Sequence, residues 1–284
     1  PDFAFAHANL GHVLQELGQF ESAQESLSRA LELDPDFGNA YDTLLFMHNY
    51  LGDMLASLML VEARRYGEMV ARLSMPYTEW SNPPDAGRPL RIGLVSGDLC
   101  YHPVGFFAEG ILAALAARGE HLALYGYPTR YSSDETSERI KSSCRGWYCV
   151  AGLSDAQLAE RIRADRIDIL IDLSGHTAHN RLPMFAWKPA PVQVAWLGYF
   201  ATTGVAEIDY LIADPWTLPP SEECNFTEKI WRLPETRLCF TPPDAAIDVS
   251  LLPALSTGRI TFGCFNNLSK MNDAVVALWS RILN

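Results

Sequence analysis

The dipeptide His102–Pro103 follows the run RIGLVSGD, which spans residues 91–98. An imidazole exchanges protons near neutral pH, and a proline fixes the local backbone. The apolar run indicates a buried strand, and open α/β sheets bind ligands at the carboxyl ends of such strands. Asp98 and Ser96 flank the same strand end and are candidates for shaping a cleft. The alternative is a loop histidine that only hydrogen-bonds a neighbour.

Two more polar segments follow predicted strands. GHTAHN at 175–180 comes after DILIDLS, and YFATTG at 199–204 comes after VQVAWLG. Small hydroxyls and glycine permit close approach of a substrate backbone, whereas the two histidines lack the cysteine or carboxylate cluster of a metal site. We therefore expect no metal, and two interpretations stay open: a substrate cleft and plain turns. The candidate residues are His176, Thr177, Tyr199, Thr202, Thr203 and Gly204.

A lysine stands before the last predicted helix. The segment FGCFNNLSK ends at Lys270, and the helix DAVVALWSRIL begins after Asn272, which is a suitable N-cap. A lysine near the amino end of a helix suits an anionic ligand, because the helix N–H groups attract negative charge too. Taken alone, this pattern favours a solvated loop lysine.

Three carboxylates are weaker candidates. Glu160, on the predicted helix 154–166, is a nominal general base, but Arg163 stands three residues later and a surface ion pair is favoured. Asp168 and Asp172 bracket a predicted strand, with Asp172 toward its ligand end. We do not expect these two to act together.

The first part of the chain contains an internal repeat that would support these loops. PDFAFAHANLGHVLQELGQ at 1–19 aligns with PDFGNAYDTLLFMHNYLGD at 35–53, a shift of 34 residues, which is the tetratricopeptide period. The second copy loses the pattern and leads into a long amphipathic helix, as a capping repeat does. A repeat buries its faces against neighbours, so we expect further repeats before residue 1. The pattern residues of the first copy are Leu10, Gly11, Leu14, Gly18, Ala23, Leu27, Ala30 and Pro35.

The pattern of apolar and polar residues changes after the proline-rich segment 81–89. Apolar strands alternate with amphipathic helices, which predicts a parallel sheet covered on both faces. No GxGxxG follows the first strand, so a dinucleotide site is not indicated. The predicted strands are 90–96, 122–128, 168–174, 192–198, 209–214, 229–233 and 259–265, and the predicted helices are 105–119, 135–144 and 154–166.

Composition excludes several classes of function. The chain has 284 residues, 48% of them hydrophobic, and a net charge of −12, which argues against bulk binding to nucleic acid or an anionic membrane. The six cysteines are scattered, which predicts reduced thiols and a cytoplasmic protein. Prolines and glycines interrupt the longest apolar stretch, so no membrane span is expected.

The repeats, LRIGLVSGDLCYHPVGFF, the KPAPVQVAWLGYFATTG segment and FGCFNNLSK together resemble the O-linked N-acetylglucosamine transferases, in particular bacterial members. These are inverting glycosyltransferases that move N-acetylglucosamine from UDP to serine or threonine of proteins. The resemblance covers almost the whole chain. Phe200 stands where the family usually has proline, a departure within the last of the three loops.

The resemblance implies a two-lobe fold of the GT-B type, an α-helical tetratricopeptide segment followed by an α/β Rossmann-like lobe, with most of a second lobe absent from this sequence. The implied boundaries are repeats and capping helix at 1–80, linker at 81–89, N-terminal catalytic lobe at 90–240, connecting loop at 241–258 and start of the C-terminal nucleotide-binding lobe at 259–284.

The resemblance also implies residue roles. It implies that His102 is an active-site residue that acts as a base or orients the acceptor. Lys270 contacts the UDP diphosphate and stabilises the departing charge, with Asn267 near the phosphates. The 175–180 and 199–204 loops line the acceptor cleft. No cofactor or metal is expected beyond the donor UDP-N-acetylglucosamine, and a protein acceptor lies along the repeat groove.

Two other functions stay open. The same fold can use another sugar nucleotide, as in protein O-fucosylation from GDP-fucose, because donor specificity lies mostly in the second lobe. A non-catalytic tetratricopeptide scaffold is the alternative from another class, and it would tolerate replacement of His102. The isolated chain is expected to be inert if the second lobe is required.

Overall fold

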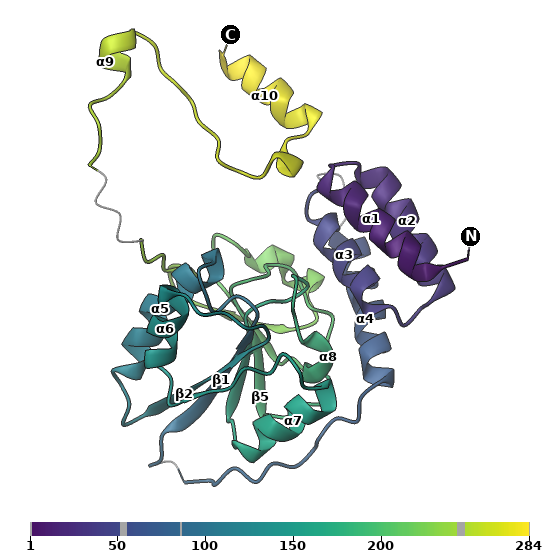
Figure 1. The fold of residues 1–284 in the computed structure, drawn as a ribbon, viewed down its shortest axis with the longest axis vertical. Coiled ribbons are helices and arrows are strands. Elements are labelled where there is room, and N and C mark those ends of the chain that lie inside the picture. The colour runs from purple at the N-terminus through teal and green to yellow at the C-terminus, as the bar shows by residue number, and fades with distance from the viewer. Residues whose placement is uncertain (1, 52–55, 86, 243–247, 284) are drawn as a thin grey trace.

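The computed structural model describes residues 2–51, 56–85, 87–242 and 248–283. A helical segment stands beside a domain built on one parallel sheet, and a long tail leaves the sheet domain and ends near the helical segment (Figure 1). Among the described helices none combines the length and the apolarity needed to cross a bilayer.

Four helices form the amino-terminal segment: α1 (Ala4–Glu16), α2 (Phe20–Leu33), α3 (Gly38–His48) and α4 (Ala56–Arg72). A Cβ on Gly11 would lie 2.6 Å from Leu27 Cγ, so only glycine lets α1 and α2 pack this closely. Ala23 and Ala30 are fully buried in the same seam. The small residues of the repeat pattern therefore act as the sequence predicts.

The described part of the sheet domain has seven strands, all parallel, in the order β3-β2-β1-β4-β5-β6-β7. The strands are β1 (Leu90–Ser96), β2 (Leu122–Pro128), β3 (Gly146–Trp147), β4 (Ile169–Asp172), β5 (Val192–Ala195), β6 (Tyr210–Ala213) and β7 (Lys229–Arg232). Six of them match predicted strands, whereas the two-residue β3 is too short to leave a pattern in the sequence.

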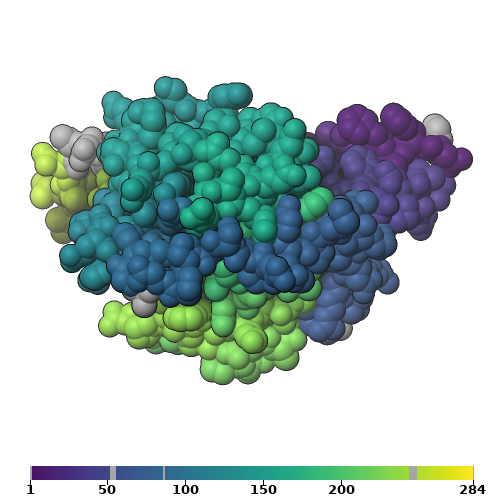
Figure 2. All heavy atoms as spheres, turned by 90° about the horizontal axis from the view of Figure 1, so that it is seen from below, coloured from purple at the N-terminus to yellow at the C-terminus, as the bar shows by residue number. Residues whose placement is uncertain are grey.

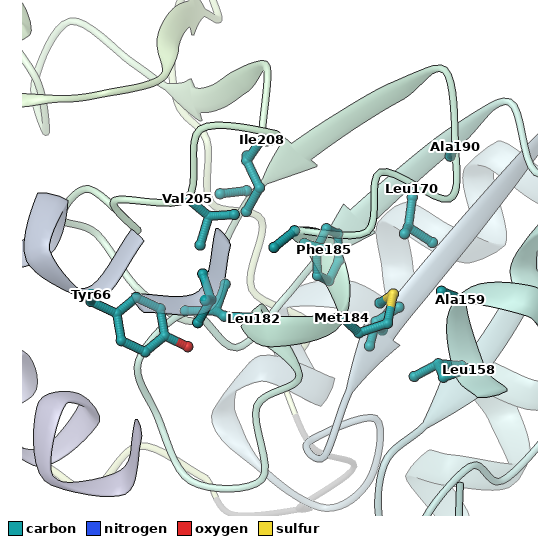
Figure 3. Close-up of a cluster of buried hydrophobic side chains, with 14 of the residues drawn as sticks. Tyr66, Leu158, Ala159, Leu170, Leu182, Met184, Phe185, Ala190, Val205 and Ile208 are labelled. Carbon is teal, nitrogen blue, oxygen red and sulfur yellow. The ribbon is translucent and has the colours of Figure 1, made fainter. Parts of the chain in front are cut away.

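Both faces of the sheet are covered. Helices α5 (Pro103–Ala116) and α6 (Glu135–Ser142) cover one face (Figure 1). Helices α7 (Asp155–Ala164) and α8 (Leu182–Phe185) cover the other face, where α4 of the repeats joins the same buried cluster. Figure 3 shows Tyr66 of α4 pointing toward Leu182 of α8. The repeats and the sheet domain thus share one apolar core.

The segment after α4 also holds the two parts together. Tyr77 N–H donates to Trp187 O at 2.9 Å, and Trp80 Nε1 donates to Lys188 O at 3.0 Å. Figure 2 shows this blue segment lying across the surface of the body. Arg163 donates to Glu79 O at 2.7 Å and lies over the Tyr77 ring. The surface ion pair predicted between Glu160 and Arg163 is therefore wrong, because the Arg163 guanidinium contacts the segment after α4 instead.

The tail after β7 packs little. It contains α9 (Ala254–Thr257), η2 (Leu268–Lys270) and α10 (Asp273–Leu283), and none of these three has a buried residue, whereas η1 (Pro220–Asn225) lies before β7. The strand predicted at 259–265 is wrong: the segment is irregular and exposed. A strand needs a partner for its N–H and C=O groups, and no described strand pairs with this segment.

Candidate functional site

The strand order reverses between β1 and β4, which lie side by side at the centre of the sheet. In open α/β sheets the crevice at such a reversal, outside the carboxyl ends of the strands, is where ligands bind. The loops after these two strands are joined by the hydroxyls of Ser96 and Ser174, whose oxygens lie 3.2 Å apart. Two of the segments singled out in the sequence, the one with His102 and the one at 175–180, thus start side by side at this reversal.

His102 is the N-cap of α5, and Pro103 is its first residue. The imidazole Nδ1 accepts a hydrogen bond from Val104 N–H at 3.3 Å. Since Nδ1 accepts, the neutral ring carries its proton on Nε2. The side chain is 39% exposed, so this N–H is free to donate to a ligand.

Asp98 and Arg130 hold the loop that carries His102. Asp98 Oδ2 lies 3.7 Å from His102 Nδ1, and Arg130 Nη2 lies 3.4 Å from Asp98 Oδ1. The same guanidinium donates from Nε to Gly97 O at 2.5 Å and from Nη2 to Cys100 Sγ at 3.1 Å. Arg130 follows the end of β2, and the Ser96–Ser174 contact joins the ends of β1 and β4, so the ends of β1, β2 and β4 converge here. Nothing in its local sequence signals this role.

His176 lies at the boundary with the repeats, and its side chain is fully buried. Its Nδ1 lies 2.7 Å from Asp42 Oδ1 of α3, and its Nε2 lies 2.9 Å from Thr203 O. Because a carbonyl oxygen only accepts, Nε2 is the donor there, and Nδ1 shares one proton with the Asp42 carboxylate. Asn180 donates to the other Asp42 oxygen at 2.9 Å. The 175–180 loop is therefore fastened to the repeats.

Asp172 ends β4 and is 1% exposed. Its oxygens accept from Gly175 N–H at 2.6 Å and Ser174 N–H at 3.2 Å, which shapes the turn into the loop. Burial raises the pKa of this carboxyl to about 6, against the two backbone hydrogen bonds and the nearby His176 ring, which lower it.

The 199–204 loop is buried as well. Tyr199 donates its hydroxyl to Leu45 O at 3.2 Å, and burial raises the pKa of this phenol. Thr203 N–H donates to Glu228 Oε1 at 2.7 Å, and Thr202 donates its hydroxyl to Glu228 Oε2 at 2.7 Å. Sequence reasoning missed Glu228, which sits just before β7 and far from the loop in sequence.

Gly204 brings this loop against α4. Its φ is +76°, and a Cβ there would lie 1.9 Å from Ala63 O. Only glycine satisfies both the left-handed backbone and the close approach. Phe200, where the family usually has proline, is 57% exposed.

The predicted cleft residues therefore separate into two groups. Four of them have side chains buried in the junction between repeats and sheet: His176, Tyr199, Thr202 and Thr203. Thr177 stays half-buried and lines a groove of about 720 Å³ between the concave side of α1 and α3 and the 175–180 loop. The buried His176 also lines this groove, whereas Tyr199, Thr202 and Thr203 are not among its lining residues.

Lys270 and Asn267 lie in the tail, apart from the sheet. Asn267 caps η2 by accepting from Ser269 N–H at 3.1 Å, and Asn272 accepts from Val275 N–H at 3.0 Å as the predicted N-cap of α10. Lys270 Nζ lies 5.8 Å from the ring centroid of Tyr50, at the end of α3. The tail thus approaches the repeats near the 199–204 loop. Within the described ranges, no cluster of three or more His, Cys, Asp or Glu side chains is placed to hold a metal ion.

Comparison with known proteins agrees with this architecture. The model of glycosyl transferase family 41 matches residues 67–241, and a tetratricopeptide repeat model matches residues 4–37. A protein from Petunia hybrida named "Probable UDP-N-acetylglucosamine--peptide N-acetylglucosaminyltransferase SPINDLY" is 39% identical over 89% of this chain and 27% of its own length. Its namesake from Arabidopsis thaliana is 38% identical over 89% of this chain and 28% of its own length.

A solved structure is similar over the whole chain. It is a lysine-to-methionine mutant of the O-GlcNAc transferase from Thermobaculum terrenum, with a TM-score of 0.88 and 38% identity, and the match covers 100% of this chain and 53% of that one. The chain thus spans about a quarter of the plant relatives and about half of this structure. With its repeats, its parallel sheet and the family match over residues 67–241, the chain belongs to glycosyl transferase family 41.

Proposed function

We propose that this chain is the acceptor-binding half of an inverting glycosyltransferase that moves N-acetylglucosamine from UDP to serine or threonine hydroxyls of proteins. The observation that carries the proposal is His102, held with a free Nε2–H at the strand reversal of the sheet. The names of the similar plant proteins and of the Thermobaculum terrenum enzyme support the choice of donor and acceptor.

In the proposed reaction the acceptor hydroxyl attacks the anomeric carbon from the face opposite UDP. The new C–O bond forms as the bond to the diphosphate oxygen breaks, UDP leaves with the electron pair of that bond, and the hydroxyl proton passes to water. His102 donates its Nε2–H to the reacting oxygens and so orients them, because Nδ1 is occupied by Val104 N–H. Asp98 and Arg130 are positioning residues that keep the imidazole at the crevice.

The negative charge that develops on UDP needs a cationic partner. Lys270 is our candidate, with Asn267 near the phosphates, because both precede the amino end of α10. This role requires Lys270 to reach the crevice, and the exposed, lightly packed tail after β7 permits such movement.

The acceptor polypeptide is proposed to lie along the groove of the repeats. Asn9 and Asn39 line this groove and are exposed, and a carboxamide offers both a donor and an acceptor to a peptide main chain. An extended segment held in this way is recognised mostly through its backbone.

The test is transfer of radiolabelled N-acetylglucosamine from its UDP donor to a serine- and threonine-containing protein acceptor. The enzyme is the full-length gene product, including whatever is encoded beyond residues 1–284, beside its His102→Asn and Lys270→Met variants. We expect transfer by the parent and a large loss in both variants. Asparagine is used at 102 because it preserves an N-cap for α5.

Two outcomes would contradict the proposal. Transfer from a GDP-sugar and not from UDP-N-acetylglucosamine would assign a different donor to the same fold. Full transfer by the His102→Asn variant would make His102 an ordinary loop residue.

A further inference from the structure

Three phenylalanines line the repeat wall of the groove: Phe5 of α1, Phe37 just before α3, and Phe46 of α3. The rings of Phe5 and Phe37 stack with their centroids 6.2 Å apart and an interplanar angle of 15°. Phe5 is 54% exposed. Large apolar side chains gathered on a concave surface are typical of a ligand contact.

The core of the repeats does not account for these rings. Its buried cluster consists of small and aliphatic residues, and Phe37 only packs at its edge. Among the buried clusters of the described chain, neither Phe5 nor Phe46 is a member. Their apolar surface is therefore available to an occupant of the groove.

The charges of the groove restrict what the occupant is. Three carboxylates line it, and two are engaged: Asp42 by His176, and Asp155 by Arg181 at 2.7 Å. Glu16 has no ion-pair partner in the part of the chain that the structure describes. This carboxylate would repel an acidic occupant, whereas it would not repel a neutral or basic one.

The wall of the groove packs against the loop before His102. His179 lines the groove, and its side chain packs so closely on Gly97 that a Cβ there would lie 2.7 Å from the His179 Cβ. Thr129, which follows β2, donates its hydroxyl to His179 O at 2.6 Å. The groove and the loop that carries His102 therefore share one wall.

We infer that the groove selects polypeptide segments that carry a large apolar side chain and no acidic residue beside it, with Phe5, Phe37 and Phe46 receiving that side chain. The inference rests on the proposed function in one respect, that the occupant of the groove is a polypeptide acceptor. It adds a side-chain preference to recognition that otherwise depends on the main chain.

The test is binding of labelled peptides to this chain, followed by fluorescence anisotropy without any sugar nucleotide. The host peptide contains glycine, alanine, serine and threonine, with one guest position that is phenylalanine, leucine, alanine or aspartate. We expect the phenylalanine and leucine peptides to bind about tenfold more tightly than the alanine peptide, since the guest side chain leaves water. We expect the aspartate peptide to bind most weakly.

Variants assign the preference to the groove. Phe46→Ala and Phe5→Ser should bind the phenylalanine and alanine peptides with similar dissociation constants, and Phe5→Ser is the safer variant because this side chain is mostly exposed. Phe262→Ala, in the tail and 66% exposed, is the matched control and should keep the preference.

Equal binding of the phenylalanine and alanine peptides by the parent would overturn the inference, as would a preference that survives in Phe5→Ser. Failure of every peptide to bind would overturn it too. Because no sugar nucleotide is present, a failure of transfer leaves this result standing, so the two proposals fail separately.

Discussion

The two ends of strand β4 hold aspartates in opposite circumstances. Asp168, before the strand, receives two hydrogen bonds of 2.7 Å from Arg88, one of 2.6 Å from Asn82 and one of 2.8 Å from Arg91 N–H. Burial raises its pKa, but these hydrogen bonds outweigh burial and hold the pKa below its ordinary value. Asp172, at the other end, accepts hydrogen bonds from the backbone N–H groups of Ser174 and Gly175, and no cationic side chain of the described residues pairs with it.

This difference is the one expected between an edge that holds the fold together and an edge proposed to meet a ligand. At the amino edge Asp168 is paired with Arg88, and the same carboxylate ties down the linker through Asn82. At the carboxyl edge a buried carboxyl carries a pKa of about 6 and an imidazole keeps a free N–H. Perturbed carboxyls and unsatisfied donors gather at functional sites.

The strongest test of this comparison is His102→Ala at the carboxyl edge. We expect transfer by the full-length protein to fall about a hundredfold or more, because an oriented proton-exchanging group is lost. The free energy of unfolding should fall by only about 1 kcal/mol, the usual effect of removing an N-cap. Transfer kinetics and thermal melts measure the two effects, and a stability loss without loss of transfer would reverse the assignment.

At the amino edge, Asp168→Ala should do the opposite. Removing this carboxylate leaves its hydrogen-bond donors, among them the Arg91 N–H and Asn82, without their partner, and we expect the free energy of unfolding to fall by about 2 kcal/mol. Transfer at a temperature where the variant is folded should be unchanged. The control is Glu32→Ala, which breaks an exposed pair with Arg29 and should have no measurable effect on urea unfolding.

The pH dependence of stability sharpens the comparison at Asp172. The carboxyl has an ordinary pKa of 3.8 and a folded pKa of about 6, so folding takes up a proton between these values. Its destabilising effect is present above about pH 6 and is relieved as the pH falls toward 3.8, a difference of about 3 kcal/mol.

The measurement is urea unfolding of the parent and of Asp172→Asn between about pH 4 and pH 7, a range that contains the folded pKa and ends just above the ordinary one. Asparagine does not titrate, so the parent should gain stability relative to the variant as the pH falls. The charged groups that act on this carboxyl, His176 and Asp42, are present in both proteins, so the comparison removes their shared contribution. A parallel pH profile for the two proteins would refute the expected proton uptake.

The smallest expected effect lies at the junction with the repeats. Tyr199→Phe removes a hydroxyl that bonds to Leu45 O and Asn49, and we expect a loss of about 1 kcal/mol in the free energy of unfolding. Tyr131→Phe, at a tyrosine that is 83% exposed, should leave the melting temperature unchanged. Equal effects of the two substitutions would mean that the junction hydrogen bond contributes nothing.

The sequence by itself determined most of the elements and the class of the fold. A repeat period of 34 residues, small residues in its seam and apolar runs between amphipathic helices each report on a local periodicity, and such periodicities predicted the repeats, six strands and the parallel sheet. It also singled out His102 as a candidate active-site residue through the family pattern, and that role stays a prediction.

Only the tertiary structure decided which polar loop residues lie at the strand reversal and which are buried in the junction between the repeats and the sheet domain. His176 and the 199–204 loop are polar in sequence, and polarity does not distinguish a side chain that faces a ligand from one that fastens two parts of a protein together. Their partners, Asp42 and Glu228, lie far away along the chain, as does Arg130 from the loop it holds. The strand expected at 259–265 failed for a related reason, since a strand depends on a neighbour and not on its own residues alone. Contacts between distant segments carry no local period, and so they appear only when the chain is folded.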